Sequence, residues 1–266
     1  MSWWGKVFGG AFGFMLGGPL GALLGTALGH GFDRGLQIQA NFGGDDAEQI
    51  QTAFFTAVFS IMGHLAKADG RVSQDEIRAA RATMAHMRLS DAQKDAAIRL
   101  FQAGKEPDFP LDDILDQFAA VCGRRRNLRQ MFLEILVGSA LADGGLGRSE
   151  RAILERVCTR LGFGVQHLEH LLMMANAARH AWGSENAGTP AASERLCLED
   201  AYGVLGVRSD TTDADVKRAY RRLMSQHHPD KLVSKGLPEE MMQLAKEKTQ
   251  DIKAAYDMIV QARNSG

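Results

Sequence analysis

Apolar residues recur with the spacing of amphipathic helices along most of this chain, and no convincing stretch alternates with the period of a β-strand. Between residues 45 and 182 this helical spacing is interrupted only by breaks that contain Gly or Pro. The expected helices cover residues 48–68, 74–87, 91–102, 111–121, 128–142, 148–161 and 165–179. The pattern predicts an all-α protein whose middle domain, residues 45–182, is a helical bundle with its own core.

The amino-terminal stretch is apolar on all sides rather than on one face. It contains no Asp, Glu, Lys or Arg from Val7 to Phe32. As a helix, residues 7–29 would extend about 34 Å, enough to cross a hydrocarbon core of about 30 Å. We therefore expect a membrane-integral protein with a single transmembrane helix in residues 1–35. A cleaved signal peptide or a buried soluble helix fits the length and the glycine content less well.

Glycine occupies every fourth position of this stretch from Gly9 to Gly29. Such a stripe lets two helix backbones approach closely inside a membrane. Because a spacing of four drifts around a helix of 3.6 residues per turn, only the middle of the stripe can face one partner. We expect a homodimer through the transmembrane helix, and a glycine-rich anchor without self-association is the alternative. The expected contacts are made by Gly13, Gly17, Gly21 and Gly25.

Two further regions follow the middle domain. Residues 183–197 are rich in small and turn-forming residues and poor in apolar ones, which predicts a flexible linker. Residues 198–266 show amphipathic helices again and form a small domain of their own. Its expected core consists of Tyr202, Leu205, Val216, Tyr220, Leu223, Leu244, Ile252, Ala255 and Tyr256.

A basic helix within this small domain leads directly to a proline. In VKRAYRRLMSQHH the Lys and Arg side chains lie mostly on one face. The opposite face is formed by Val216, Tyr220, Leu223 and His227. Pro229 ends the helix, because proline lacks a backbone donor and restricts the residue before it. We therefore expect His228 and Asp230 to project from a turn with little conformational freedom.

The segments LEDAYGVLGV, VKRAYRRLMSQHHPDK and QDIKAAYDMI, in this order, resemble the J-domain of DnaJ-type co-chaperones. An HPD triad between a basic AYRRL helix and a second helix is a specific pattern. The resemblance implies an antiparallel helix pair whose tip triggers ATP hydrolysis in a DnaK-type chaperone. It implies partner binding by the triad and by a basic docking face. These residues are His228, Pro229, Asp230, Lys217, Arg221 and Arg222.

Some features depart from the J-domain pattern or from full-length DnaJ. Gly203 stands in mid-helix where a helix former is usual, and Leu232 follows Lys231 where a polar residue is common. These residues are expected to loosen the domain slightly. The chain also lacks a Gly/Phe-rich segment and CxxCxGxG repeats, so independent client holding is not expected.

An internal repeat lies in the middle domain. HLAKADGRVSQDE and GSALADGGLGRSE share Ala-Asp-Gly, with an acid seven residues after the Asp. The pair resembles the TerB-like (tellurite-resistance B) helical domain, whose acidic residues are associated with metal binding. That resemblance implies a divalent cation, Ca or Mg, at Asp69, Glu76, Asp143 and Glu150. The favoured alternative is turn and capping chemistry, in which Gly70 closes a helix and the acid caps the next one.

Composition excludes several classes of function. A net charge of −1 argues against a nucleic-acid binder. The widely spaced Cys122, Cys158 and Cys197 form no CxxC motif, so neither a disulfide framework nor a zinc site is expected. No nucleophile, base and orienting group recur at a catalytic spacing, so we do not expect an enzyme.

The whole chain resembles the membrane-anchored, DnaJ-like co-chaperones of Gram-negative bacteria. That resemblance implies a regulator of a DnaK-type ATPase at the cell inner membrane. Flanking charges hardly determine the orientation. Because a DnaK-type partner is cytosolic, we expect a periplasmic amino terminus and cytoplasmic carboxy-terminal domains. The alternative is a non-catalytic membrane scaffold or sensor whose TerB-like domain binds metal or a partner.

Overall fold

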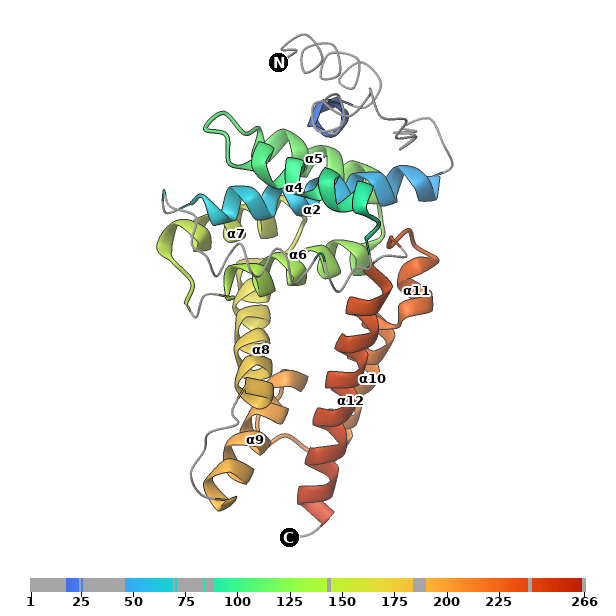
Figure 1. Ribbon diagram of the computed structural model, residues 1–266. Helices are drawn as coiled ribbons and strands as arrows, with labels where there is room; N and C mark the ends of the chain where they lie inside the picture. The colour runs from blue at the N-terminus through green and yellow to red at the C-terminus, as the bar shows by residue number, and fades with distance from the viewer. Residues whose placement is uncertain are drawn as a thin grey trace.

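The computed structural model describes residues 18–23, 25, 46–68, 70, 84, 89–142, 145–183, 190–238 and 241–264. Every regular element among these residues is a helix, so the all-α prediction is confirmed. Figure 1 shows a block of crossed helices and several long helices that extend from it toward the C-terminus. The last helices stand with one end against the block.

The block is built around helix α2 (Asp46–Ala66). Its neighbours are α4 (Asp91–Gly104), α5 (Leu111–Cys122), α6 (Arg126–Ala140) and α7 (Arg148–Arg160). The starts predicted at residues 91, 111 and 148 agree with the structure. The helix predicted for residues 74–87 lies outside the described residues, apart from Met84.

Close packing makes this block a rigid support. The Phe54 ring on α2 meets Phe118 and Phe132 edge-on, with centroids 5.8 and 5.5 Å apart. A Cβ atom added to Gly104 on α4 would lie 1.8 Å from the Ser60 carbonyl oxygen on α2. The backbones of α2 and α4 therefore touch at this point, and only glycine permits the approach.

Helix α8 (Val165–Gly183) leaves the block and packs along α9 (Pro190–Leu205). Residues 184–189 of the predicted linker lie outside the described residues, and the remainder from Pro190 is helical. A Cβ atom on Gly203 would lie 2.5 Å from the Cβ of Ala177 on α8. This contact explains the mid-helix glycine, because the close approach leaves no room for a side chain.

The chain ends in a hairpin of α10 (Asp213–His227) and α12 (Met242–Asn264), joined through the short α11 (Pro229–Val233). The Thr212 side chain accepts a hydrogen bond from the Asp215 amide and caps α10. Tyr220 and Tyr256 stack with ring centroids 4.2 Å apart. The expected core is confirmed except for Leu244, which packs against the buried cluster of the block instead.

The turn end of this hairpin is docked on the helical block. The apolar residues of α11, the following loop and early α12 belong to the same buried cluster as α2, α5 and α6; they are Leu232, Leu237, Met241 and Ala245. Gly236 has φ +98°, and a Cβ atom there would lie 2.8 Å from Ile50 Cγ2 on α2. The expectation that Leu232 loosens the small domain is therefore wrong, because its fully buried side chain contacts the block.

Most of the predicted transmembrane segment lies outside the described residues. Residues 18–23 are helical, and the Leu20 amide donates to Gln117 Oε1 on α5 at 2.8 Å. No helix within the described ranges is both long and apolar enough to span a bilayer. Of the expected dimer contacts, Gly13 and Gly17 are not among the described residues. Dimerisation stays a prediction.

Candidate partner-binding site

The HPD triad lies where α10 passes into α11. His228 has φ −59° and ψ 121°, an extended conformation that proline imposes on its predecessor. Pro229 is the first residue of α11, and the Leu232 amide donates to the His228 carbonyl at 3.1 Å. Asp230 therefore stands in the first turn of a short helix rather than in an open turn. The side chains of His228 and Asp230 are exposed, as expected for a contact site.

The basic residues predicted for partner binding are exposed along the same helix. Lys217, Arg221 and Arg222 follow one another on α10 toward the triad. Their neighbour Arg218 is paired with Asp215 at 2.6 Å. No ion pair between Lys217 or Arg221 and another described residue is found. The structure thus places these residues on the helix that leads to the triad, with Arg222 beside the cavity between α10 and the block, and their role stays a prediction.

A link between the two helices holds the triad in place. Lys231 Nζ, one residue after the triad, donates to Ser225 Oγ on α10 at 2.9 Å. Ser234 Oγ donates to the Lys231 carbonyl at 3.1 Å and closes the end of α11. The Lys231–Ser225 bond therefore joins α11 to α10, and the buried Leu232 anchors α11.

A buried charge cluster connects the residue before the triad to the helical block. Glu134 on α6, with 9% of its side chain exposed, lies 3.4 Å from His227 Nε2 and 3.6 Å from Lys248 Nζ. Gln130 Nε2 also donates to Glu134 at 2.9 Å. Near the cluster, Asn127 Nδ2 donates to the Gln226 carbonyl at 3.4 Å. The C-terminal end of α10 is therefore held against α6 by polar as well as apolar contacts.

The charges of this cluster are set by burial and by neighbours. Burial disfavours the ionised Glu134, but His227, Lys248 and Gln130 outweigh it and lower the pKa of the carboxyl. Burial lowers the pKa of His227, which the Glu134 charge only partly offsets. At neutral pH the cluster therefore pairs a carboxylate with the Lys248 ammonium beside a neutral imidazole. The spacing of residues in the sequence could not predict this charge cluster, because Glu134 and Lys248 lie in different domains.

The residues predicted to bind metal are only partly described. Asp69, Glu76 and Asp143 lie outside the described residues. Glu150 is 7% exposed, and its Oε2 accepts a hydrogen bond from the Gly147 amide at 2.8 Å. Gly70 has φ +88°, the left-handed conformation expected after a helix. These findings support capping chemistry at the described positions, and no metal-ligating cluster occurs among the residues that the structure describes.

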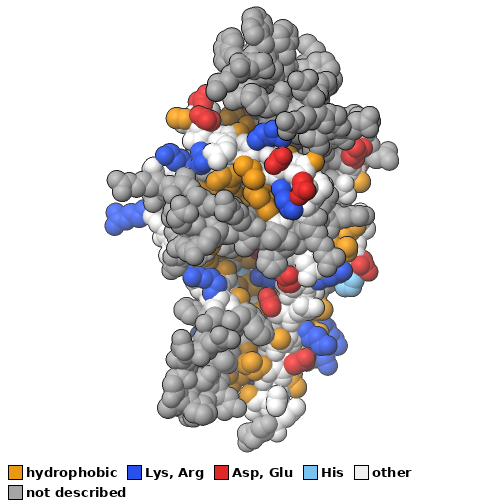
Figure 2. All heavy atoms as spheres, in the orientation of Figure 1, with side chains coloured by type: hydrophobic (Ala, Val, Ile, Leu, Met, Phe, Trp, Pro, Cys, Tyr) orange, Lys and Arg blue, Asp and Glu red, His pale blue; other side chains and the backbone are white. Residues whose placement is uncertain are grey.

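The surface of the described residues carries both signs of charge. Figure 2 shows Lys and Arg side chains interspersed with Asp and Glu on the face drawn there. This mixture agrees with the net charge of −1. The exposed basic residues of α10 are therefore a local feature of that helix.

Three family models match the chain in sequence order. Residues 1–39 match the co-chaperone DjlA transmembrane domain, residues 55–172 match tellurite resistance protein TerB, and residues 200–264 match the DnaJ domain. The second and third matches cover the helical block and the terminal hairpin.

Proteins of known name resemble the chain over nearly its full length. The co-chaperone protein DjlA of Shewanella oneidensis is 47% identical over 99% of both chains. That of Aliivibrio fischeri is 46% identical over 97% of this chain and 98% of its own. That of Coxiella burnetii is 46% identical over 81% of this chain and 80% of its own. No solved structure matches.

Proposed function

The chain belongs to the DjlA family of co-chaperone proteins, and we propose that it stimulates ATP hydrolysis by a DnaK-type chaperone through its J-domain. In this proposal the chain regulates a partner ATPase and has no active site of its own. The observation that carries it is the triad His228-Pro229-Asp230 at the end of a basic helix, with the His228 and Asp230 side chains exposed.

The basic helix supplies the attraction between the two proteins. Lys217, Arg221 and Arg222 present exposed positive charge, which suits an acidic surface on the partner. Such charges steer encounter and fix orientation more than they add affinity. The triad then makes the contact that changes the partner's ATP site. Its restricted backbone means that little conformational freedom is lost on binding.

The contact takes place at a membrane. The match to the DjlA transmembrane domain supports a membrane-anchored protein. We place the chain in the cell inner membrane with a periplasmic amino terminus, because a DnaK-type partner and its ATP are cytosolic. Self-association through Gly13, Gly17, Gly21 and Gly25 would present two J-domains at one membrane position. The proposal of self-association rests on the glycine pattern alone.

The proposal is tested by single-turnover ATP hydrolysis. A DnaK-type chaperone loaded with ATP is mixed with increasing amounts of the full chain in neutral detergent micelles. We expect acceleration that saturates, and we expect Arg221→Gln to raise the half-maximal concentration about two- to fivefold. Lys253→Gln, an exposed α12 position away from the triad, is the matched control and should leave it unchanged. No acceleration by the unaltered chain would overturn the proposal.

A further inference from the structure

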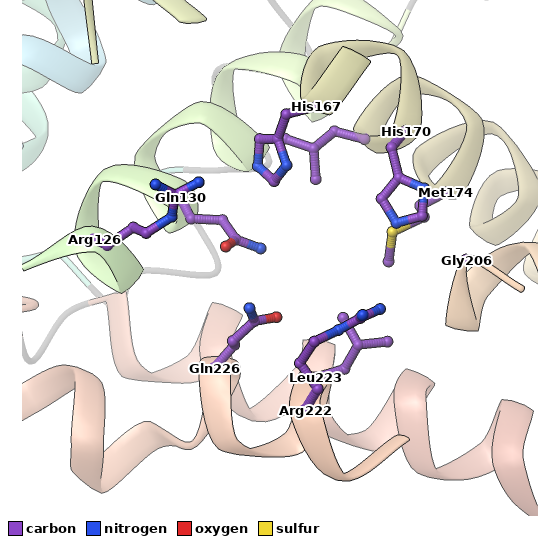
Figure 3. A pocket seen from close by; sticks show the side chains of 10 residues that line it. Arg126, Gln130, His167, His170, Met174, Gly206, Arg222, Leu223 and Gln226 are labelled. Carbon is purple, nitrogen blue, oxygen red and sulfur yellow. The ribbon is translucent and has the colours of Figure 1, made fainter. Parts of the chain in front are cut away.

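An open cavity of about 390 Å³ lies between the helical block and the J-domain (Figure 3). Helices α6 and α8 form its walls on one side, and α10 closes it on the other. Gly206, at the end of α9, completes the lining. The cavity is therefore bounded by both domains, and a molecule bound there would contact both.

Basic side chains enter this cavity from three helices. Arg126 comes from α6, His167 and His170 from α8, and Arg222 from α10 (Figure 3). The remaining polar lining consists of amides, and none of the lining residues carries a carboxylate. The cavity is thus rich in hydrogen-bond donors and in positive charge.

The two cavity arginines have no carboxylate partner among the described residues. Arg151, Arg156 and Arg263 each form an ion pair with a carboxylate. Neither Arg126 nor Arg222 forms an ion pair with any described residue. Their guanidinium groups therefore remain available to an anion.

Contacts around the cavity position Arg126, His167 and His170 before any ligand binds. The His167 ring stacks on Phe163 with centroids 4.7 Å apart, and the Arg126 guanidinium carbon lies 4.7 Å from the same ring. A Cβ atom on Gly206 would lie 2.2 Å from His170 Cε1, so the glycine makes room for that ring. These packed positions lower the ordering cost of binding.

The two imidazoles of the cavity lie in a partly buried environment in which positive charge dominates. The buried Nε2 atom of His167 has no hydrogen-bond partner among the described residues. Burial and the positive charge of Arg126 lower the pKa of His167, while burial and Arg222 lower that of His170. The Glu134 carboxylate raises both pKa values, but by less than burial and the arginines lower them.

We propose that this cavity binds a phosphate-bearing small molecule between the TerB-like domain and the J-domain. Arginine forks match the oxygens of a phosphate group, and a dianion satisfies several donors that one carboxylate cannot. Arg126 and Arg222 would hold the ligand from opposite domains and so stabilise their docking. The binding itself does not depend on the proposed co-chaperone activity.

Calorimetric titration of the full chain in neutral detergent micelles tests this proposal, with inorganic pyrophosphate as the probe. We expect one site per chain, weakened about tenfold or more by Arg126→Gln and by His170→Gln. Arg124→Gln is the matched control, because this exposed arginine lies just before α6 and does not line the cavity. Circular dichroism confirms that each variant is folded.

Other outcomes of this titration would contradict phosphate binding in the cavity. A dissociation constant above about 5 mM for the unaltered chain would overturn the proposal, as would equal weakening by Arg124→Gln. Acetate binding as tightly as pyrophosphate would overturn the assignment to a phosphate-bearing ligand.

A second titration uses sulfate, whose charge stays constant across the neutral range. A bound dianion favours protonated His167 and His170, so their pKa values should rise on binding. The groups that face these rings are Arg126 and Glu134 on α6 and Arg222 on α10. Sulfate should therefore bind severalfold more tightly as the pH falls from about 7.5 to 6. His170→Gln should reduce this dependence, and a pH-independent affinity would contradict direct contact with the imidazoles.

Discussion

Replacement of Gly203 by Ala should destabilise the protein, although alanine is the better helix former. In an exposed helix interior this exchange stabilises by about 1 kcal/mol. At Gly203 the new Cβ would lie 2.5 Å from the Cβ of Ala177. Neither Cβ atom can rotate away, so α8 and α9 must separate by about 1 Å to reach an ordinary carbon contact. Overpacking of this kind costs about 1–3 kcal/mol, which offsets or exceeds the gain in propensity.

The matched control is Gly138→Ala on α6, where nothing lies within 4 Å of the added atom. Urea unfolding of the full chain, followed by circular dichroism, measures both variants. We expect Gly138→Ala to raise the unfolding midpoint and Gly203→Ala to leave it unchanged or lower it, a difference of about 1–3 kcal/mol between the two. Equal stabilisation by both substitutions would refute the close contact between α8 and α9.

Three further outcomes can be measured. Stability should fall as the pH drops below 6.5, because burial lowers the pKa of His227 and the unfolded chain then binds the extra proton. In urea unfolding at pH 7.5 and 5.5, His227→Gln should lessen that loss, and an unchanged loss would exclude a contribution from this imidazole. Gly17→Leu with Gly21→Leu should reduce crosslinked dimer in membranes, and an undiminished yield would argue against close packing through the stripe. Calorimetric titration with Ca and Mg should be flat if the repeat serves only in capping, whereas heat that Asp69→Ala with Asp143→Ala abolishes would establish a metal site there.

Local patterns made most of the fold predictable. Helix starts at residues 91, 111, 148 and 165 agree with the structure because turn residues and apolar periodicity coincide there. The break at Pro229 also follows from local chemistry. The packing of the J-domain on the block was not predicted, since it depends on contacts between residues far apart in the chain. Glu134 with Lys248 is such a contact, because neither residue has a local signal of burial.

The two departures from the J-domain pattern were the available signals for this docking. Considered within the J-domain alone, Gly203 is a poor helix former and Leu232 is an apolar residue where a polar one is common. In the structure Gly203 allows α8 to approach α9 closely, and Leu232 is buried in the cluster of the block. A residue type that is unfavourable within one domain can thus indicate that this position contacts a second domain.

The most direct test of the account is the effect of His228→Gln on single-turnover ATP hydrolysis by a DnaK-type chaperone. The imidazole is exposed and is not part of the core, so the variant should remain folded, as circular dichroism would show. Lys253→Gln on α12 serves as the control for an exposed change outside the triad. The account predicts that the unaltered chain and Lys253→Gln accelerate hydrolysis equally, whereas His228→Gln does not accelerate it. Full acceleration by the folded His228→Gln variant would contradict a triggering role for the triad.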